Sequence, residues 1–149
     1  MKKAIINISW EETIETGVVY IDLDGGFFPK YNWFDCPLGV VEMWLLSVWE
    51  FISKNYMLPC ELFFMDGPFS VILTANEQGV INLHKNEMSQ DHEVEIVDFS
   101  SFVDSLLQCA KRISIYLHNQ NTYSTLMRAQ NIDRLRKRIM RKMYTRSTD

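Results

Sequence analysis

The chain has 149 residues, a length that suits one ordinary domain with one hydrophobic core. Apolar residues make up 47% of the chain and charged residues 23%, which excludes an intrinsically disordered protein. The most apolar stretch, residues 37–52, is interrupted by Glu42 and Glu50 and is too short to cross a bilayer. We therefore predict no membrane span.

Charge is distributed unevenly along the chain. The formal net charge is −4 at pH 7, yet residues 131–149 carry seven Lys or Arg against two Asp, which leaves −9 for residues 1–130. An acidic body of this kind repels nucleic acid and attracts basic partners. We expect no nucleic-acid partner, although the same charge also serves solubility, and the choice between these interpretations stays open.

The N-terminal quarter of the chain predicts two strands followed by a loop. Residues 3–10 alternate weakly between apolar and polar, and residues 17–24 are rich in β-branched and aromatic side chains, as strands are. Gly25 and Gly26 then end the second strand. Residues 27–37 contain two prolines and five aromatic residues, which predicts a long structured loop.

The next segment predicts a helix and a series of hairpins. Apolar residues recur at intervals of three and four from Leu38 onward, which is typical of a helix, and this helix should end near Asn55. Turn sequences rich in Gly, Pro, Asn and Asp then separate three strand-like runs, residues 60–65, 69–75 and 80–84. Because short turns join these runs, we expect a largely antiparallel sheet.

The last third predicts one more strand and two helices. Residues 93–99 alternate as a half-buried strand does, and Ser100 or Ser101 can cap a helix that extends to about Leu117. Residues 131–144 form a basic amphipathic helix with four apolar residues on one face: Ile132, Leu135, Ile139 and Met143. The chain is thus predicted to be a single domain, residues 1–149, of the α+β class, with a mainly antiparallel sheet packed against two to three helices.

The basic helix allows two interpretations. Its clustered Arg and Lys side chains could contact phosphates or acidic lipids, as such clusters do. Aromatic residues are absent from the cluster until Tyr144, and its apolar stripe requires a surface to cover it. We therefore expect the helix to dock on the acidic body with its cations in solvent.

Cysteine and histidine positions give no sign of a metal site. The three cysteines are widely spaced and lie among apolar residues, as reduced buried thiols of a cytosolic protein do: Cys36, Cys60 and Cys109. The three histidines lack ligand spacing with one another or with a cysteine: His84, His92 and His118. We predict no metal and no cofactor. The N-terminus does not resemble an export signal, so we expect a cytoplasmic location.

One short motif has the form of a catalytic sequence. Asp22-Leu23-Asp24-Gly25 follows a predicted strand and resembles the nucleophile motif of haloacid dehalogenase-type phosphatases. The resemblance implies Asp22 as nucleophile and Asp24 as general acid, with Mg²⁺ between them. Gly26 stands where that family has Thr or Val, and its Gly-Asp-x-x-x-Asp motif is absent. We keep a Mg-dependent phosphatase as the alternative function, and a non-enzymatic role as the main expectation.

The aromatic loop is the strongest candidate for a binding site, because aromatic residues outside regular structure often anchor protein interfaces. Acidic residues stand beside these aromatic residues in the sequence. The alternative, that the rings cover one edge of the core, stays open. The predicted binding site comprises seven residues: Asp24, Phe28, Tyr31, Trp33, Phe34, Asp35 and Glu42.

The order of motifs between about residues 15 and 117 resembles a known class of proteins. The motifs are Phe27-Phe28-Pro29, Trp33-x-Asp35-x-Pro37, a Trp-rich helix, Phe64-Met65-Asp66-Gly67-Pro68, a hairpin and a strand–helix unit. Together they resemble the small immunity proteins of bacterial polymorphic or contact-dependent growth-inhibition toxin systems. The resemblance implies a cytoplasmic protein that neutralises a cognate toxin by occluding its active site or a neighbouring surface. The expected partner is a basic toxin domain, such as a nuclease.

Overall fold

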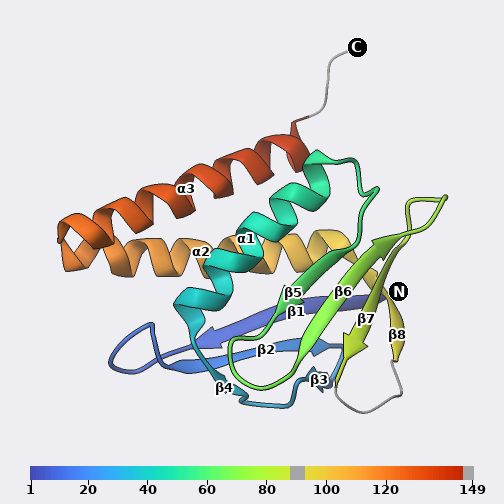
Figure 1. Ribbon diagram of the computed structural model, residues 1–149, viewed down its shortest axis with the longest axis horizontal. Coiled ribbons are helices and arrows are strands. Elements are labelled where there is room, and N and C mark those ends of the chain that lie inside the picture. The colour runs from blue at the N-terminus through green and yellow to red at the C-terminus, as the bar shows by residue number, and fades with distance from the viewer. Residues whose placement is uncertain (88–92, 146–149) are drawn as a thin grey trace.

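The computed structural model describes residues 1–87 and 93–145, in which one sheet is covered on one face by helices (Figure 1). The described residues form eight strands and three helices. In chain order they are β1 (Lys2–Ser9), β2 (Gly17–Leu23), β3 (Gly26–Phe28), β4 (Phe34–Asp35), α1 (Pro37–Ser53), β5 (Cys60–Phe63), β6 (Ser70–Ala75), β7 (Ile81–Asn86), β8 (Val94–Asp98), α2 (Phe99–Gln120) and α3 (Tyr123–Tyr144).

The sheet has the strand order β3-β2-β1-β8-β7-β6-β5, and β4 pairs with β2 beside β3. Its pairs are antiparallel except that of β1 with β8, which is parallel and aligns Lys2 with Val97. The predicted α+β class and the largely antiparallel sheet are therefore confirmed. The strand predicted at residues 93–99 is β8, and it reaches β1 at the centre of the sheet.

The core lies between the sheet and the helices α1 and α2. Alternate residues of the central strands point into it, including Ile6 of β1 and Ile21 of β2. Trp44 of α1 is completely buried there, and its ring meets Phe64 edge-on at 5.1 Å between centroids. Its Nε1 donates to the carbonyl oxygen of Phe63 at 2.7 Å, so this buried indole N–H is satisfied. Among the described residues, no helix has the combined length and apolar character that crossing a membrane requires.

The structure differs from the sequence prediction in the segment between β2 and α1 and at the starts of α2 and α3. The segment predicted as a loop contains β3 and β4, because its backbone completes the hydrogen bonding of the outer edge of β2. α2 begins at Phe99, and its N-cap is Asp98, whose carboxylate accepts from the Ser100 amide at 3.1 Å. Ser101 has another role, since its hydroxyl accepts from the Ala4 amide and ties α2 to β1.

α3 forms an outer layer that packs on α1 and α2 (Figure 1). It starts at Tyr123, earlier than predicted, because Thr122 caps it through a reciprocal pair of hydrogen bonds with Thr125. Ile132 and Ile139 are buried against the other helices. The predicted docking of its apolar stripe is therefore confirmed, and most of its cations face solvent.

A half-buried carboxylate on α3 joins the outer layer to α2. Asp133 accepts from the Ser114 hydroxyl at 2.8 Å, lies 3.2 Å from Nε2 of His118, and accepts from Arg136 at 3.3 Å. Burial alone would raise the pKa of Asp133, but the hydrogen bonds from Ser114, His118 and Arg136 outweigh it and lower this pKa below its usual value.

We predict that Ile139→Ala lowers the free energy of unfolding by about 2–5 kcal/mol, because it leaves a cavity in a completely buried site. The neighbouring Met140→Ala serves as the control, since Met140 is exposed and its change should stay within about 0.5 kcal/mol. Urea denaturation of both variants measures the difference. Equal effects would contradict the docking of α3 through this face.

We predict that Asp133→Asn destabilises the protein at neutral pH, and that the difference from the wild type shrinks as pH falls below about 4. A depressed folded pKa means that the ionised group stabilises the fold above the unfolded pKa and that this contribution is lost in acid. Thermal unfolding from pH 3 to 7 tests this, with the exposed Asp66→Asn as control. A difference that does not change with pH would refute the role given to this carboxylate.

Candidate functional site

Strand β2 has one face in the core and one face that no described helix covers (Figure 1). Val19, Ile21 and Leu23 point towards the helices and are buried. By strand alternation, Val18, Tyr20 and Asp22 point to the opposite side, and all are partly exposed. The candidate site starts from this uncovered side of β2.

Four aromatic residues gather on this side, and we call them the aromatic face: Tyr20, Phe27, Tyr31 and Phe34. Register places Phe27 opposite Asp22 and Phe34 opposite Val18, so both rings lie on the uncovered side. Tyr20, Phe27 and Tyr31 are mutually in contact, with centroids 5.1–5.7 Å apart. Phe27, Tyr31 and Phe34 are nevertheless 39%, 59% and 61% exposed. Tyr20, Phe27 and Tyr31 thus support one another, and the aromatic face remains open to a partner.

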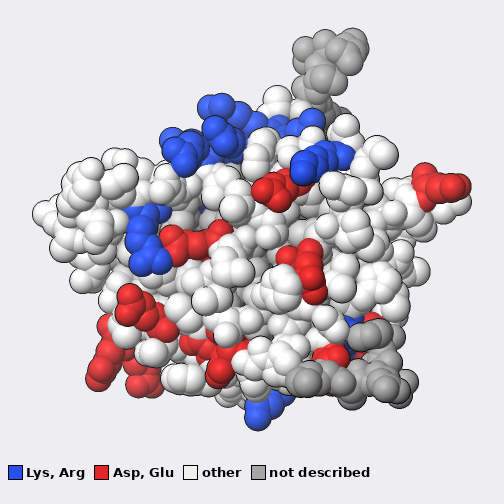
Figure 2. Space-filling model, viewed as in Figure 1, with Lys and Arg blue, Asp and Glu red and all other residues white. Residues whose placement is uncertain are grey.

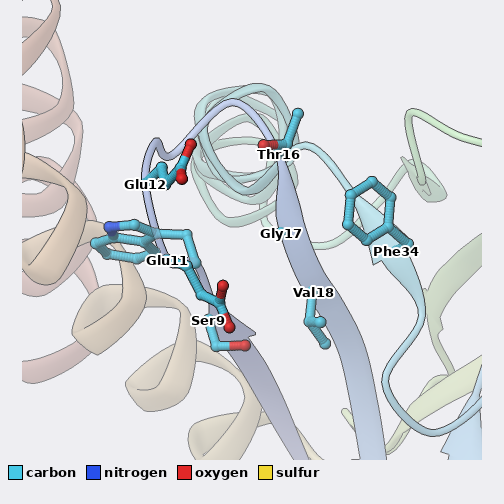
Figure 3. A pocket seen from close by; sticks show the side chains of 8 residues that line it. Ser9, Glu11, Glu12, Thr16, Gly17, Val18 and Phe34 are labelled. Atoms are coloured by element: carbon cyan, nitrogen blue, oxygen red, sulfur yellow. The ribbon is translucent and has the colours of Figure 1, made fainter.

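A cleft of about 510 Å³ lies between Phe34 and the loop that joins β1 to β2 (Figure 3). Figure 3 shows Phe34 on one side, Glu11 and Glu12 on the other, and Gly17 and Val18 between them. Gly17 is required at this base, because a Cβ there would come within 2.1 Å of the Ser9 carbonyl oxygen. We call this hollow the acidic cleft, and it adjoins the aromatic face through Phe34 and Val18.

The loop that carries the two glutamates is held against α2. Trp10 packs edge-on against Tyr116 at 5.8 Å, and the Arg112 guanidinium lies 5.0 Å above the Trp10 ring. Arg112 also donates to the Ile8 carbonyl at 3.0 Å, and the Tyr116 hydroxyl donates to the Glu12 carbonyl at 3.4 Å. These contacts fix the backbone from which the Glu11 and Glu12 side chains project.

Two residues of the predicted binding site lie in the interior. Phe28 is 1% exposed and packs against Phe64 and Phe69. Asp35 is 5% exposed, and its carboxylate accepts from Trp33 Nε1 at 3.0 Å, from the Cys36 amide at 2.7 Å and from the Asp66 amide at 3.2 Å. Neither side chain reaches the surface, so neither belongs to the candidate site.

Two further predicted residues have structural contacts. Trp33 is half-buried, with its ring edge-on to Phe69 at 5.1 Å and its N–H on Asp35. Glu42 lies on α1, where its carboxylate receives two hydrogen bonds from Arg128 of α3, one of them at 3.2 Å. It thus joins two helices on the other side of the sheet.

Three predicted residues remain at the surface: Asp24, Tyr31 and Phe34. Sequence reasoning missed Tyr20 and Phe27 as part of the site, and it also missed the two glutamates of the acidic cleft. Strand alternation could have found Tyr20, because it stands between the apolar Val19 and Ile21. Nothing local in the sequence could place Glu11 beside Phe34, since the pairing of β4 with β2 brings them together.

Asp22 lies near the end of β2, and Asp24 lies in the turn that joins β2 to the antiparallel β3. Asp22 Oδ1 accepts from the Gly25 amide at 2.8 Å, and Asp24 Oδ2 accepts from the Lys3 amide at 3.2 Å. Asp24 has a positive φ of 52°, which the turn requires. The strand that follows is β3, which folds back on β2 in antiparallel pairing.

The described residues contain no group of three or more His, Cys, Asp or Glu side chains arranged to hold a metal ion. His92 lies outside the described residues. The three cysteines are free thiols, and burial raises the pKa of both Cys60 and Cys109 to about 12. Cys36 is half-buried, and its Sγ accepts from the Gly39 amide at the start of α1.

Comparisons of the chain with models of protein families, with curated proteins and with solved structures found no match. What the site can bind is therefore inferred from its own geometry and chemistry: exposed rings on a sheet, beside carboxylates on an anchored loop.

We predict opposite outcomes for two phenylalanines of the segment between β2 and α1. Phe28→Ala should lower the free energy of unfolding by about 3–5 kcal/mol, because it empties a core site. Phe34→Ala should change it by less than about 0.5 kcal/mol, because the ring faces solvent. Chemical denaturation of both variants measures this, and a large loss in Phe34→Ala would place that ring in the core instead of the candidate site.

Proposed function

We propose that this protein is a cytoplasmic immunity protein that binds and neutralises a toxin domain through the aromatic face. The observation that carries the proposal is the exposure of Phe27, Tyr31 and Phe34 on the uncovered side of the sheet. Large exposed aromatic patches on a folded domain are typical of protein-binding surfaces. The order of motifs that resembles the immunity proteins supplies the kind of partner.

The aromatic face has the properties of a binding anchor. Aromatic side chains bury much apolar area while losing few rotameric degrees of freedom, so they supply a large share of interface energy. Contacts among Tyr20, Phe27 and Tyr31 restrict these rings before binding. A surface ordered in advance loses less conformational entropy on association, which favours slow dissociation.

Charge favours a basic partner at this end of the molecule. Figure 2 shows acidic side chains gathered over the loop between β1 and β2, and Lys and Arg side chains gathered along α3 on another side. Within that loop, residues 10–16 hold three glutamates and no cation. A separation of this kind orients an approaching basic domain towards the acidic end and raises its association rate.

We predict that co-expression of the protein protects cells from the toxin domain encoded beside its gene. Phe34→Ala should weaken that protection by raising the dissociation rate, since loss of a central aromatic anchor costs about 2 kcal/mol or more, or roughly thirtyfold in Kd. Growth assays and surface plasmon resonance measure the two effects.

The matched control is Phe63→Ala. Phe63 is also exposed and lies on the same uncovered side, but it belongs to β5 at the opposite edge of the sheet. This variant should bind as the wild type does. Death of cells that contain abundant folded wild-type protein would refute the immunity role, and equal effects of both variants would refute the aromatic face as the binding site.

A further inference from the structure

The acidic cleft has a shape and chemistry that the aromatic face does not share. The aromatic face consists of rings on one side of the sheet, whereas the cleft is a hollow of about 510 Å³ that is lined by the Glu11 and Glu12 carboxylates as well as by the Phe34 ring. Its volume lies within the range of roughly 300–1,000 Å³ that is typical of clefts that bind small ligands. We propose that the acidic cleft receives an arginine side chain of the protein partner.

The carboxylates of the cleft lack a cationic partner of their own. Among the described residues, neither Glu11 nor Glu12 forms an ion pair. Arg112 of α2, which contacts the start of this loop, is engaged with the Trp10 ring and the Ile8 carbonyl. Negative charge in the cleft is therefore uncompensated, and a cation from outside is complementary to it.

The opposite wall selects the type of cation. Phe34 is 61% exposed and stands across the cleft from the glutamates (Figure 3). A guanidinium is planar, stacks on aromatic rings and donates hydrogen bonds in a fork that suits carboxylates, whereas an ammonium is a compact and strongly hydrated charge. A site with a ring on one side and carboxylates on the other therefore favours arginine over lysine.

The base of the cleft is rigid enough to hold such a side chain in one place. Gly17 lies against the Ser9 carbonyl, and β2 is paired on both edges there, with β1 through Val18 and with β4 through Phe34. The Tyr116 contact fixes the Glu12 backbone on the other side. Binding would thus order only the two glutamate side chains and the arriving arginine, which limits the entropy lost.

The experiment uses the tripeptide Gly-Arg-Gly amide as the probe, with Gly-citrulline-Gly and Gly-Lys-Gly amides as neutral and ammonium controls. The backbone amides of Thr16, Gly17 and Val18 are followed by NMR during titration of the full chain. We expect saturable shifts at these amides with the arginine peptide. Glu11→Gln combined with Glu12→Gln should weaken binding by about threefold to tenfold, because each exposed charge pair contributes modestly.

Glu77→Gln is the control variant, since it removes one exposed carboxylate from the turn between β6 and β7. It should bind the peptide as the wild type does. Equal affinity for the citrulline or lysine peptide, shifts spread over the molecule, or unchanged binding by the Glu11 and Glu12 double variant would each overturn the proposal.

This inference rests on the proposed function for its partner, but the two fail separately. If the protein binds arginine selectively but protects no cell, the cleft is supported as an arginine site and the immunity role is refuted. Protection that is lost in Phe34→Ala, together with no arginine binding, would retain the aromatic face and refute the cleft.

Discussion

The buried carboxylate of Asp35 is the constraint on which the candidate site depends. It accepts hydrogen bonds from the Trp33 ring, from the N-cap of α1 through the Cys36 amide, and from the turn before β6 through the Asp66 amide. A buried polar group is tolerated only when it is hydrogen-bonded, and these three donors reach both oxygens of the Asp35 side chain. Because Asp35 and Trp33 face inward, Phe34 between them faces outward, as strand alternation requires. One interior interaction therefore sets the direction of the exposed ring.

The sequence predicts correctly those elements whose pattern is set by neighbouring residues. It fails for residues and strands whose contacts lie far away along the chain. The strands β1 and β2 and the helix α1 follow from residue periodicity, which neighbouring residues determine. The strands β3 and β4 have three and two residues and stand beside prolines, so they carry no periodic signal and exist only because β2 offers an open edge. The sequence places Asp35 in the binding site because it stands beside the aromatic residues of the loop, whereas its buried position depends on donors such as the Asp66 amide, 31 residues away. Of the aromatic face, the sequence therefore predicted only Tyr31 and Phe34.

The position of α3 keeps its basic side chains apart from the acidic end of the domain. Its apolar stripe is covered by α1 and α2, while Glu42 and Asp133 pair with Arg128 and Arg136 at the boundary. The remaining cations lie on the side away from the sheet, where they do not neutralise the glutamates of the β1–β2 loop (Figure 2). Opposite charges at separate ends orient an approaching partner more than a uniform charge of the same total would. The basic helix thus increases the charge difference between the two ends of the molecule, and it also stabilises the fold.

The same topology leaves little strand edge open to backbone pairing with another chain. An open strand edge invites pairing with another chain, but the outer edge of β2 is already paired with β3 and β4, and Val19 donates to the Trp33 carbonyl between them. At the other edge, α1 packs against β5, and Trp44 donates to the Phe63 carbonyl. Strands as short as β3 and β4 offer little length for strand addition. A partner that binds as proposed would therefore contact the rings and carboxylates of one sheet face, and its affinity would depend on the shape and charge that these side chains present.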